Sequence, residues 1–395
     1  MKYDFDTVID RRGTNSEKWD VAQNELPMWV ADMDFKAAPE IILALEKRLK
    51  HGVFGYSGIP EEWYAAYTGW WRRRHQFEIN PEWMVFVTGV VPAISSIIRK
   101  LSTPAEKVLI QTPVYNIFFN SILNNGRQVL ESPLTLKGDR YEIDFERLEK
   151  DLSDPQTSLM LVCNPQNPGG RIWTRDELIT VAELCKKYDV RVIADEIHCD
   201  VVAPGSRYVP FASVSETARD ISVTCISPSK AFNIAGLHSA AVFAADKKIR
   251  HMVRRGLNTD EVAEPNVFAV TAATAAFNEG EEWLDALNQY IEENKQMACK
   301  YITANVDGIR ALYGPATYLL WLDVRDLPEG GRGFAAFLRE KTGLFLSVGE
   351  IYGQAGQGFL RMNLACPRTV LEDGLRRLKA GTEMYRAEKS QKVKQ

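Results

Sequence analysis

The chain has 395 residues and a formal net charge of −4, and 45% of its residues are hydrophobic and 25% charged. This composition is typical of a soluble globular protein, and the mixed acidic and basic residues give no basic face for nucleic acid. The first twenty residues are polar and charged, and no apolar run is long enough to cross a bilayer. We therefore expect a cytoplasmic protein that binds neither nucleic acid nor membrane.

The six cysteines stand at positions 163, 185, 199, 225, 299 and 366, and none forms a CxxC pair. Disulfide and metal frameworks use close and regular spacing. We therefore expect reduced, mostly buried thiols and no metal site. Cys199 and Cys225 are near the motifs described below, so we expect them at most to line a site without acting in it.

The middle of the chain alternates short β-branched runs with amphipathic stretches. Strands are predicted at 84–88, 107–111, 158–163, 190–194 and 221–226. Thr174 followed by Glu177 forms a capping box, which predicts that a helix begins at about residue 175. Nearly continuous apolar strands separated by helices indicate a mostly parallel sheet covered on both faces.

From about residue 280 the pattern changes. It predicts a long helix and then alternating strands and helices, over 281–306, 316–324, 334–342, 359–365 and 370–389. We therefore expect an α/β protein with a large domain at 46–282. A smaller α+β domain would combine residues 1–45 and 283–395, because the first segment is too short for a core of its own.

Chemically distinctive groups follow four of the predicted strands, and in open α/β sheets ligands bind beyond the carboxyl ends of the strands. These groups are free helix N–H groups, an amide, a carboxylate and a lysine with two hydroxyls, from Val90 and Val91, Asn167, Asp195, and Ser227, Ser229 and Lys230. Pyridoxal 5′-phosphate (PLP) would need this set. Its phosphate binds N–H groups and hydroxyls, and its 3′-oxygen accepts from a hydrogen-bond donor. Its aldehyde reacts with an amine, and its ring nitrogen pairs with a carboxylate.

The segments NPQNPGG, ADEIH and SPSKAFNIAG, in this order, resemble the class I/II aminotransferases, which are fold-type I PLP enzymes. Other segments resemble one branch, the MalY/PatB-type C–S lyases or cystathionine β-lyases: MWVADMDF, FGYSGIP, TGVVPAI, TPVYNIF, DEIHCD and LRMNLACPR. The resemblance covers nearly the whole chain. It implies α,β-elimination of L-cystathionine or related S-substituted cysteines to pyruvate, ammonia and a thiol.

The resemblance also implies roles for the matching residues. Lys230 would hold PLP as a Schiff base and, once freed by the substrate amine, act as general base at Cα. Asp195 would pair with the pyridinium nitrogen. Asn167 would donate to the 3′-oxygen and help to place the substrate carboxylate. Arg361 would clamp that carboxylate, a task that suits the planar guanidinium group.

Further residues would complete the cofactor site. Tyr115 would stack on the pyridine ring. The phosphate would be held by backbone N–H groups and hydroxyls from Val90, Val91, Ser227 and Ser229. Tyr56 would reach the phosphate of a neighbouring subunit, which implies a homodimer. His198 stands where many aminotransferases have a tyrosine near the 3′-oxygen, and His238 where many have a phosphate-binding arginine.

Three other functions are compatible with this fold: an aminotransferase, a transcription regulator and a non-catalytic scaffold. None of the motif residues separates elimination from transamination, so a PLP-dependent aminotransferase of an α-amino acid remains the alternative. A PLP-sensing transcription regulator would carry an N-terminal DNA-binding domain, and the family motifs begin by about residue 27, so we expect none. A non-catalytic scaffold is disfavoured because it need not retain Lys230, Asp195, Asn167 and Arg361 together.

Overall fold

The computed structural model describes residues 2–393. Its largest sheet has seven strands in the order β2-β10-β9-β8-β7-β3-β4. In chain order these strands are β2 (Met84–Val87), β3 (Lys107–Ile110), β4 (Gln128–Glu131), β7 (Thr157–Cys163), β8 (Arg191–Asp195), β9 (Ser222–Ile226) and β10 (Ala240–Phe243). Strands β4, β3, β7, β8 and β9 pair in parallel, whereas β10 is antiparallel to both β9 and β2.

The predicted mostly parallel sheet is confirmed, and each of its five predicted strands lies within a residue or two of an observed one. Strands β4 and β10 were not predicted from the sequence. Strand β10 reads AAVF, in which two alanines give little β-propensity. Strand β4 is an edge strand with no fully buried residue, so its hydrophobic pattern is weak.

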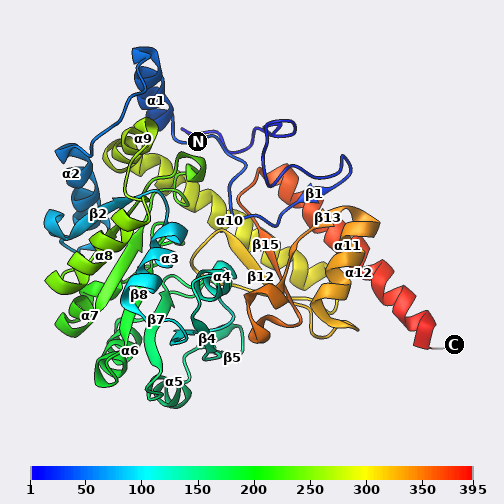
Figure 1. The fold of residues 1–395 in the computed structure, drawn as a ribbon. Coiled ribbons are helices and arrows are strands. Elements are labelled where there is room, and N and C mark those ends of the chain that lie inside the picture. Colours follow the sequence, from blue (N-terminus) through cyan, green and yellow to red (C-terminus); the bar gives the residue numbers. More distant parts are fainter. Residues whose placement is uncertain (1, 394–395) are drawn as a thin grey trace.

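Helices cover both faces of this sheet (Figure 1). One face packs against α3 (Val90–Leu101), α4 (Ile117–Leu123) and α8 (Lys247–Thr259). The other face packs against α5 (Phe145–Leu152), α6 (Arg175–Lys187) and α7 (Glu216–Ile221), and near β10 against α1 (Pro39–His51), α2 (Glu61–Trp70) and α9 (Val267–Glu279). Helix α6 begins at the predicted capping box, in which the Thr174 side chain accepts from the Glu177 N–H and the Glu177 carboxylate from the Thr174 N–H.

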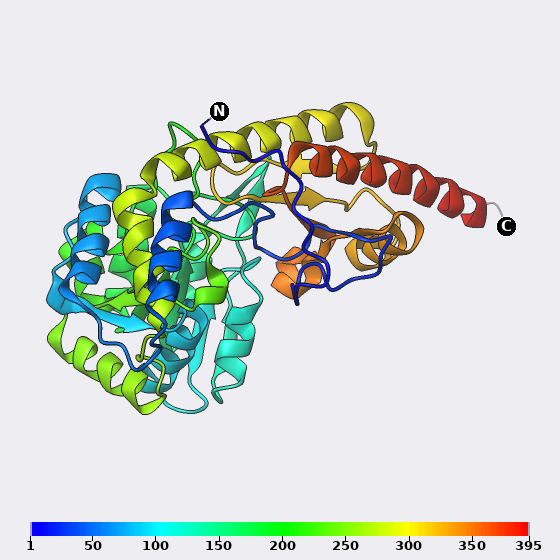
Figure 2. The same ribbon diagram turned by 90° about the horizontal axis from the view of Figure 1, so that it is seen from above.

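The C-terminal part of the chain forms a second, antiparallel sheet. Its strands, in sheet order, are β11 (Arg310–Leu312), β12 (Leu319–Asp323), β15 (Phe359–Asn363) and β14 (Ser347–Val348). It packs with α10 (Glu281–Asn305), α11 (Gly330–Thr342) and α12 (Arg368–Val393), and α10 and α12 run side by side in Figure 2. A small hairpin of β5 (Thr135–Lys137) and β6 (Arg140–Glu142) lies outside both sheets.

Two elements join the units. Helix α10 buries Trp283 and Leu287 in a core shared with the large sheet, and Ala298 and Ile302 in the core of the C-terminal unit. The N-terminal segment also contacts both, because β1 (Leu26–Pro27) pairs in parallel with β13 (Leu344–Phe345), whereas α1 packs against α9. The domain boundaries at 45 and 282 stay predictions. Within residues 2–393, no helix is long and apolar enough to span a membrane.

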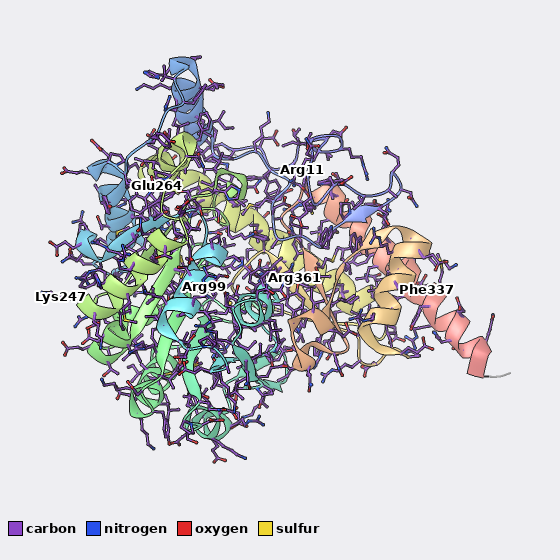
Figure 3. The ribbon with its side chains drawn as sticks, viewed as in Figure 1. Arg11, Arg99, Lys247, Glu264, Phe337 and Arg361 are labelled. Carbon is purple, nitrogen blue, oxygen red and sulfur yellow. The ribbon has the colours of Figure 1, made fainter. Side chains whose placement is uncertain are left out.

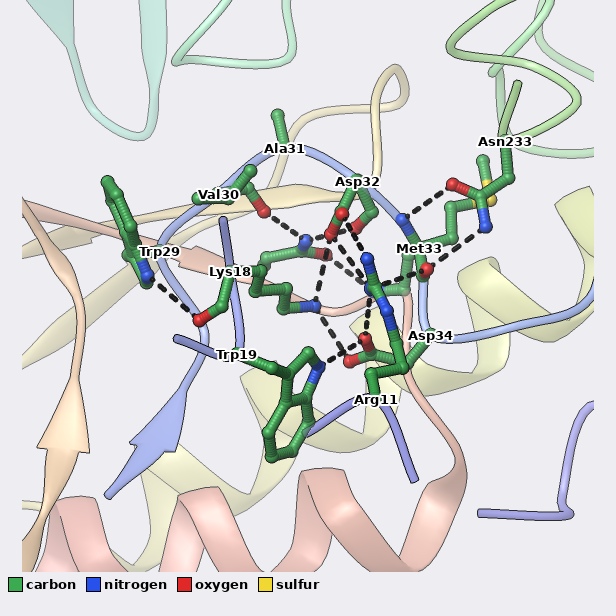
Figure 4. Close-up of polar contacts among 12 residues, drawn as sticks. Arg11, Lys18, Trp19, Trp29, Val30, Ala31, Asp32, Met33, Asp34 and Asn233 are labelled. Carbon is green, nitrogen blue, oxygen red and sulfur yellow. Dashed lines mark hydrogen bonds and ion pairs between the residues drawn. The ribbon is translucent and has the colours of Figure 1, made fainter. Parts of the chain in front are cut away.

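Residues 29–35, which we call the N-terminal strap, pass between the two units and are held by side chains from both (Figure 4). From the C-terminal unit, Asn363 donates to the carbonyls of Val30 and Asp32, at 2.6 Å each. From the large unit, the Asn233 side chain accepts from the Met33 N–H and donates to the Met33 carbonyl, at 3.1 and 3.0 Å.

A buried ion network fixes the strap to the residues that precede it (Figure 4). The Asp34 carboxylate accepts from Lys18 Nζ and Arg11 Nη1, both at 2.7 Å, and from Trp19 Nε1 at 2.9 Å. Lys18 is only 1% exposed. Asp32 pairs with Arg11 at 2.6 Å. The strap therefore depends on charges that are withdrawn from water and that compensate one another.

Asp34→Ala should destabilise the protein strongly, because it leaves the buried Lys18 ammonium without its closest partner. Removing one member of a buried ion pair costs about 3–5 kcal/mol. Urea unfolding followed by fluorescence measures the loss. Asp307→Ala is the matched control, since Asp307 pairs with Arg386 at the surface and is 86% exposed. Equal stability of the two variants would contradict the structural role of Asp34.

Candidate active site

The carboxyl ends of β2, β7, β8 and β9 open onto a cavity of about 440 Å³. The cavity is lined by every predicted site residue except Tyr56, namely Val90, Val91, Tyr115, Asn167, Asp195, His198, Ser227, Ser229, Lys230, His238 and Arg361. Arg361, labelled in Figure 3, belongs to β15 and lies on the side of the C-terminal unit that is near the large sheet. The structure therefore brings together residues that are up to 271 positions apart, counted from Val90 to Arg361.

Lys230 follows β9 and points toward the strap. Its Nζ donates to the Ala31 carbonyl at 2.7 Å, and Tyr318 Oη donates to the same carbonyl at 2.9 Å. The pKa of Lys230 is lowered to about 8, mainly by burial and also by the charge of Arg361, whereas the charges of Asp32 and Asp195 oppose the shift. A lysine with this pKa is neutral far more often near pH 7 than a surface lysine, so it can act as a nucleophile or base.

Asp195 is the last residue of β8 and is 4% exposed. Its Oδ1 accepts a hydrogen bond from the Ile197 N–H at 3.1 Å. Burial raises the pKa of Asp195 to about 6, while the Ile197 hydrogen bond and the charge of Lys230 lower it. A nearby cation would favour the ionised form, so this carboxylate suits a protonated ring nitrogen.

Arg361 and Asn167 both line the cavity and contact each other. Arg361, on β15 and 5% exposed, donates through Nη1 to Asn167 Oδ1 at 3.2 Å and through Nη2 to the Trp29 carbonyl at 2.9 Å. Its guanidinium lies 5.1 Å from the ring centre of Tyr352. Its Nε is buried and has no hydrogen-bond partner among the described residues. Because Asn167 accepts through Oδ1, its amide N–H groups remain available to donate.

A group of hydrogen-bond donors lies where α3 begins. The first N–H groups of a helix have no partner within the helix, and Pro92 carries none, so the N–H groups of Val90 and Val91 are free to bind an anion. Ser227 Oγ lies 2.8 Å from Ser229 Oγ and donates to the Ser239 carbonyl at 2.7 Å. This chemistry fits a phosphate. His238 is exposed at the rim of the cavity and in the left-handed backbone region, with φ of 53°.

His198 is buried beside the Tyr318 ring, with the two ring centres 6.1 Å apart. Burial lowers the pKa of His198 to about 3, and the positive charges of Lys230 and Arg361 add to the effect. Its Nδ1 is buried with no hydrogen-bond partner among the described residues. The ring is therefore neutral at physiological pH and can serve as a hydrogen-bonding group rather than as a cation.

The structure adds residues that the sequence analysis did not assign to the site. The strap residues Trp29 and Ala31 belong to the segment MWVADMDF, which carried the family resemblance but no site role. Tyr352 and Cys163 also line the cavity. Their types and spacing carry no chemical signal, so only the fold could reveal them.

Three residues near the motifs lie outside the lining of this cavity. Cys199 and Cys225 do not line the cavity, because both are buried in the hydrophobic cores, and Cys163 lines it instead. Tyr56 is absent from the cavity lining of its own chain, and its side chain is fully exposed to solvent. Its expected role at the site of a neighbouring subunit stays a prediction. The six cysteines are free thiols and five of them are buried, which confirms the expectation for the thiols.

Comparison with known proteins agrees with this geometry. The aminotransferase class I and II family matches residues 20–378. Cystathionine beta-lyase PatB of Bacillus subtilis is 41% identical over 95% of this chain and 99% of its own length, and protein MalY of Escherichia coli 37% over 94% and 97%. The crystal structure of cystalysin from Treponema denticola, which contains a PLP cofactor, superimposes with a TM-score of 0.94 at 35% identity, covering 97% of this chain and 99% of that one.

Directly after Asp195, Glu196 turns away from the cavity into the protein. It is 0% exposed, and its Oε1 accepts from the Phe211 N–H at 2.8 Å and from Asn164 Nδ2 at 3.1 Å. Burial raises the pKa of Glu196 to about 7, while contacts with Tyr208, Phe211 and Asn164 lower it. Its protonated form therefore stabilises the fold, fully below pH 4.5, and this contribution is lost as pH rises through 7.

Glu196→Gln should remove this pH dependence, because the amide keeps the accepting oxygen and cannot ionise. Between pH 5 and pH 8 the cofactor-free wild type should lose about 2–3 kcal/mol more unfolding free energy than the variant. Urea unfolding at the two pH values measures the difference. Glu183→Gln, which changes an exposed carboxylate, is the control. Parallel pH profiles for wild type and Glu196→Gln would show that Glu196 does not ionise in this range.

Proposed function

This chain belongs to the aminotransferase class I and II family, and we propose that it is a PLP-dependent C–S lyase. Its substrates would be L-cystathionine or related S-substituted cysteines, which it would cleave to pyruvate, ammonia and a thiol. The family predicted from the motifs is confirmed by the match over residues 20–378. The convergence of Lys230, Asp195, Asn167 and Arg361 on one cavity supports PLP chemistry on an amino acid. The observation that favours a lyase over an aminotransferase is the 41% identity to cystathionine beta-lyase PatB over 95% of this chain.

The residues present fit PLP. An amine, a buried carboxylate, an amide donor, an aromatic ring and a set of phosphate donors line the cavity, from Lys230, Asp195, Asn167, Tyr115, and Val90, Val91, Ser227 and Ser229. The buried and unpartnered Nδ1 of His198 is a further group that a polar ligand could satisfy. When bound, PLP would supply an electron sink for the electron pair left at the substrate Cα.

The protein's own residues would do the rest. Arg361 would bind the substrate α-carboxylate and orient the Cα–H bond, with Asn167 beside it. The Lys230 amine, whose pKa is held near 8, would take the proton from Cα. Cleavage of the Cβ–S bond then releases a thiolate, and the proton held by Lys230 is available to the leaving sulfur. The remaining three-carbon fragment takes up one water from solvent to give pyruvate and ammonia. Asp195 would keep the ring nitrogen protonated throughout.

Pyruvate should form when the PLP-loaded enzyme is incubated with L-cystathionine and no keto acid. Lys230→Ala should abolish this reaction and the visible absorption of the reconstituted protein. Loss of a general base alone costs about a hundredfold or more in rate. Lys187→Ala, at a surface lysine that is 59% exposed, is the control. Turnover that appears only after 2-oxoglutarate is added would identify an aminotransferase instead, and an active Lys230→Ala enzyme would remove Lys230 from the reaction.

We further propose that the active unit is a homodimer in which Tyr56 reaches the phosphate site of the partner. Tyr56 is fully exposed and lies outside the cavity of its own chain. Four other large hydrophobic side chains are exposed near it in sequence, Leu43, Leu49, Val53 and Phe54. Several exposed apolar side chains within one short segment are consistent with a protein interface there. A cytoplasmic location, expected from the composition, stays a prediction.

Mixing Tyr56→Ala and Lys230→Ala chains tests the shared site. Random reassociation makes half of the dimers mixed, and each mixed dimer has one site with both residues intact, so about a quarter of wild-type activity should return. The two variants assayed separately give the baseline. Activity of the mixture that equals the average of the two parents would contradict a shared site, and light scattering on the wild type checks its dimeric mass.

A further inference from the structure

Building on the proposed lyase activity, we propose that Glu17 makes the enzyme prefer cysteine conjugates whose sulfur substituent ends in a positive charge. S-(2-aminoethyl)-L-cysteine is the simplest member of this class. The preference concerns the part of the substrate beyond Cβ, for which the motifs predict nothing.

Glu17 lines the same cavity as Lys230 and Arg361. Its side chain is exposed, and within residues 2–393 it makes no hydrogen bond or ion pair with another residue. Its charge nevertheless acts on the site, because it raises the pKa of both Lys230 and Tyr115. An acidic group without a partner at the wall of a binding cavity is available to a cation on the ligand.

The backbone around Glu17 is held in place. The N–H groups of Trp19 and Asp20 donate to the Ser16 carbonyl at 3.0 and 2.8 Å, which closes a turn around Glu17. The next residue, Lys18, is buried and paired with Asp34, as Figure 4 shows. The Trp29 indole N–H donates to the Lys18 carbonyl at 3.4 Å. Glu17 is therefore anchored to the strap and is not part of a loose N-terminal segment.

The cavity is lined by charges of both signs in different environments, because Glu17 is exposed, Arg361 is buried and Lys230 is partly buried. Arg361 and Lys230 are buried or partly buried and serve the amino-acid end of the substrate. The sulfur substituent points away from that end. Apolar side chains, including Trp29, Ile117 and Ile351, line the cavity and can pack against its methylene groups. A terminal ammonium group would then meet Glu17, whereas a terminal carboxylate would be repelled.

The test compares substrates of matched length. S-(2-aminoethyl)-L-cysteine and S-propyl-L-cysteine differ in the charge of the terminal group and little in size, and S-carboxymethyl-L-cysteine carries a negative charge. Pyruvate release gives kcat/KM for each. Glu17→Gln should lower the aminoethyl-to-propyl ratio by up to about fivefold, the upper end of the range for an exposed ion pair. Glu17→Lys should lower it further and raise the rate with the carboxymethyl substrate.

Two controls distinguish a direct contact of Glu17 with the terminal group of the substrate from a general effect of the substitution on charge or activity. Asp20→Asn removes an exposed charge from the same turn without altering the cavity lining, so it should leave the ratio unchanged. Added salt should reduce the aminoethyl preference in the wild type and have little effect on it in Glu17→Gln, because screening weakens exposed ion pairs.

The results distinguish the two proposals. If the wild type cleaves S-propyl-L-cysteine and neither substitution at Glu17 changes the ratios, the role of Glu17 is wrong and the lyase proposal stands. If the PLP-loaded enzyme releases pyruvate from none of the three conjugates or from L-cystathionine, the lyase proposal is wrong and the role of Glu17 falls with it.

Discussion

The site depends on keeping opposite charges out of water in one cavity. Asp195 and Arg361 are buried and Lys230 is partly buried, and burial is the largest influence on the pKa of both Lys230 and Asp195. Burial moves these two pKa values toward each other, from 10.5 to about 8 and from 3.8 to about 6. Near neutral pH a small change in local charge can therefore decide which group carries the proton. Such groups suit a reaction that moves a proton from carbon.

The N-terminal strap makes this arrangement possible because the site is built from distant parts of the chain. Lys230 and Asp195 come from the ends of parallel strands, whereas Arg361 comes from the antiparallel sheet. The strap lies between them and accepts hydrogen bonds from both units. Its backbone carbonyls bind Lys230 and Arg361 directly, at Ala31 and Trp29. The distance between the amine and the guanidinium is thus set by a backbone segment rather than by side chains alone.

Much of this could be predicted from sequence. Apolar strands such as 158–163 are buried on both faces, so their identity does not depend on distant contacts, and the polar groups at their ends follow from sheet geometry. Strand β10 could not be predicted in this way, because its two alanines are strand residues only through pairing with β9 and β2. The strap could not be assigned to the site either, since its contribution is made by backbone carbonyls, which every residue has. Glu17 and Tyr352 were missed for a related reason, because long-range packing alone places them at the cavity.

The Ala31 carbonyl accepts hydrogen bonds from both Lys230 and Tyr318, which affects how easily Lys230 can leave it. A buried carbonyl that loses its only donor carries a desolvation penalty, which would hold Lys230 in place or loosen the strap whenever the amine turned toward a ligand. Tyr318 donates to the same oxygen, so this acceptor keeps a partner when Lys230 leaves. The Lys230 amine can therefore leave the Ala31 carbonyl and turn toward a ligand without a change in the position of the strap.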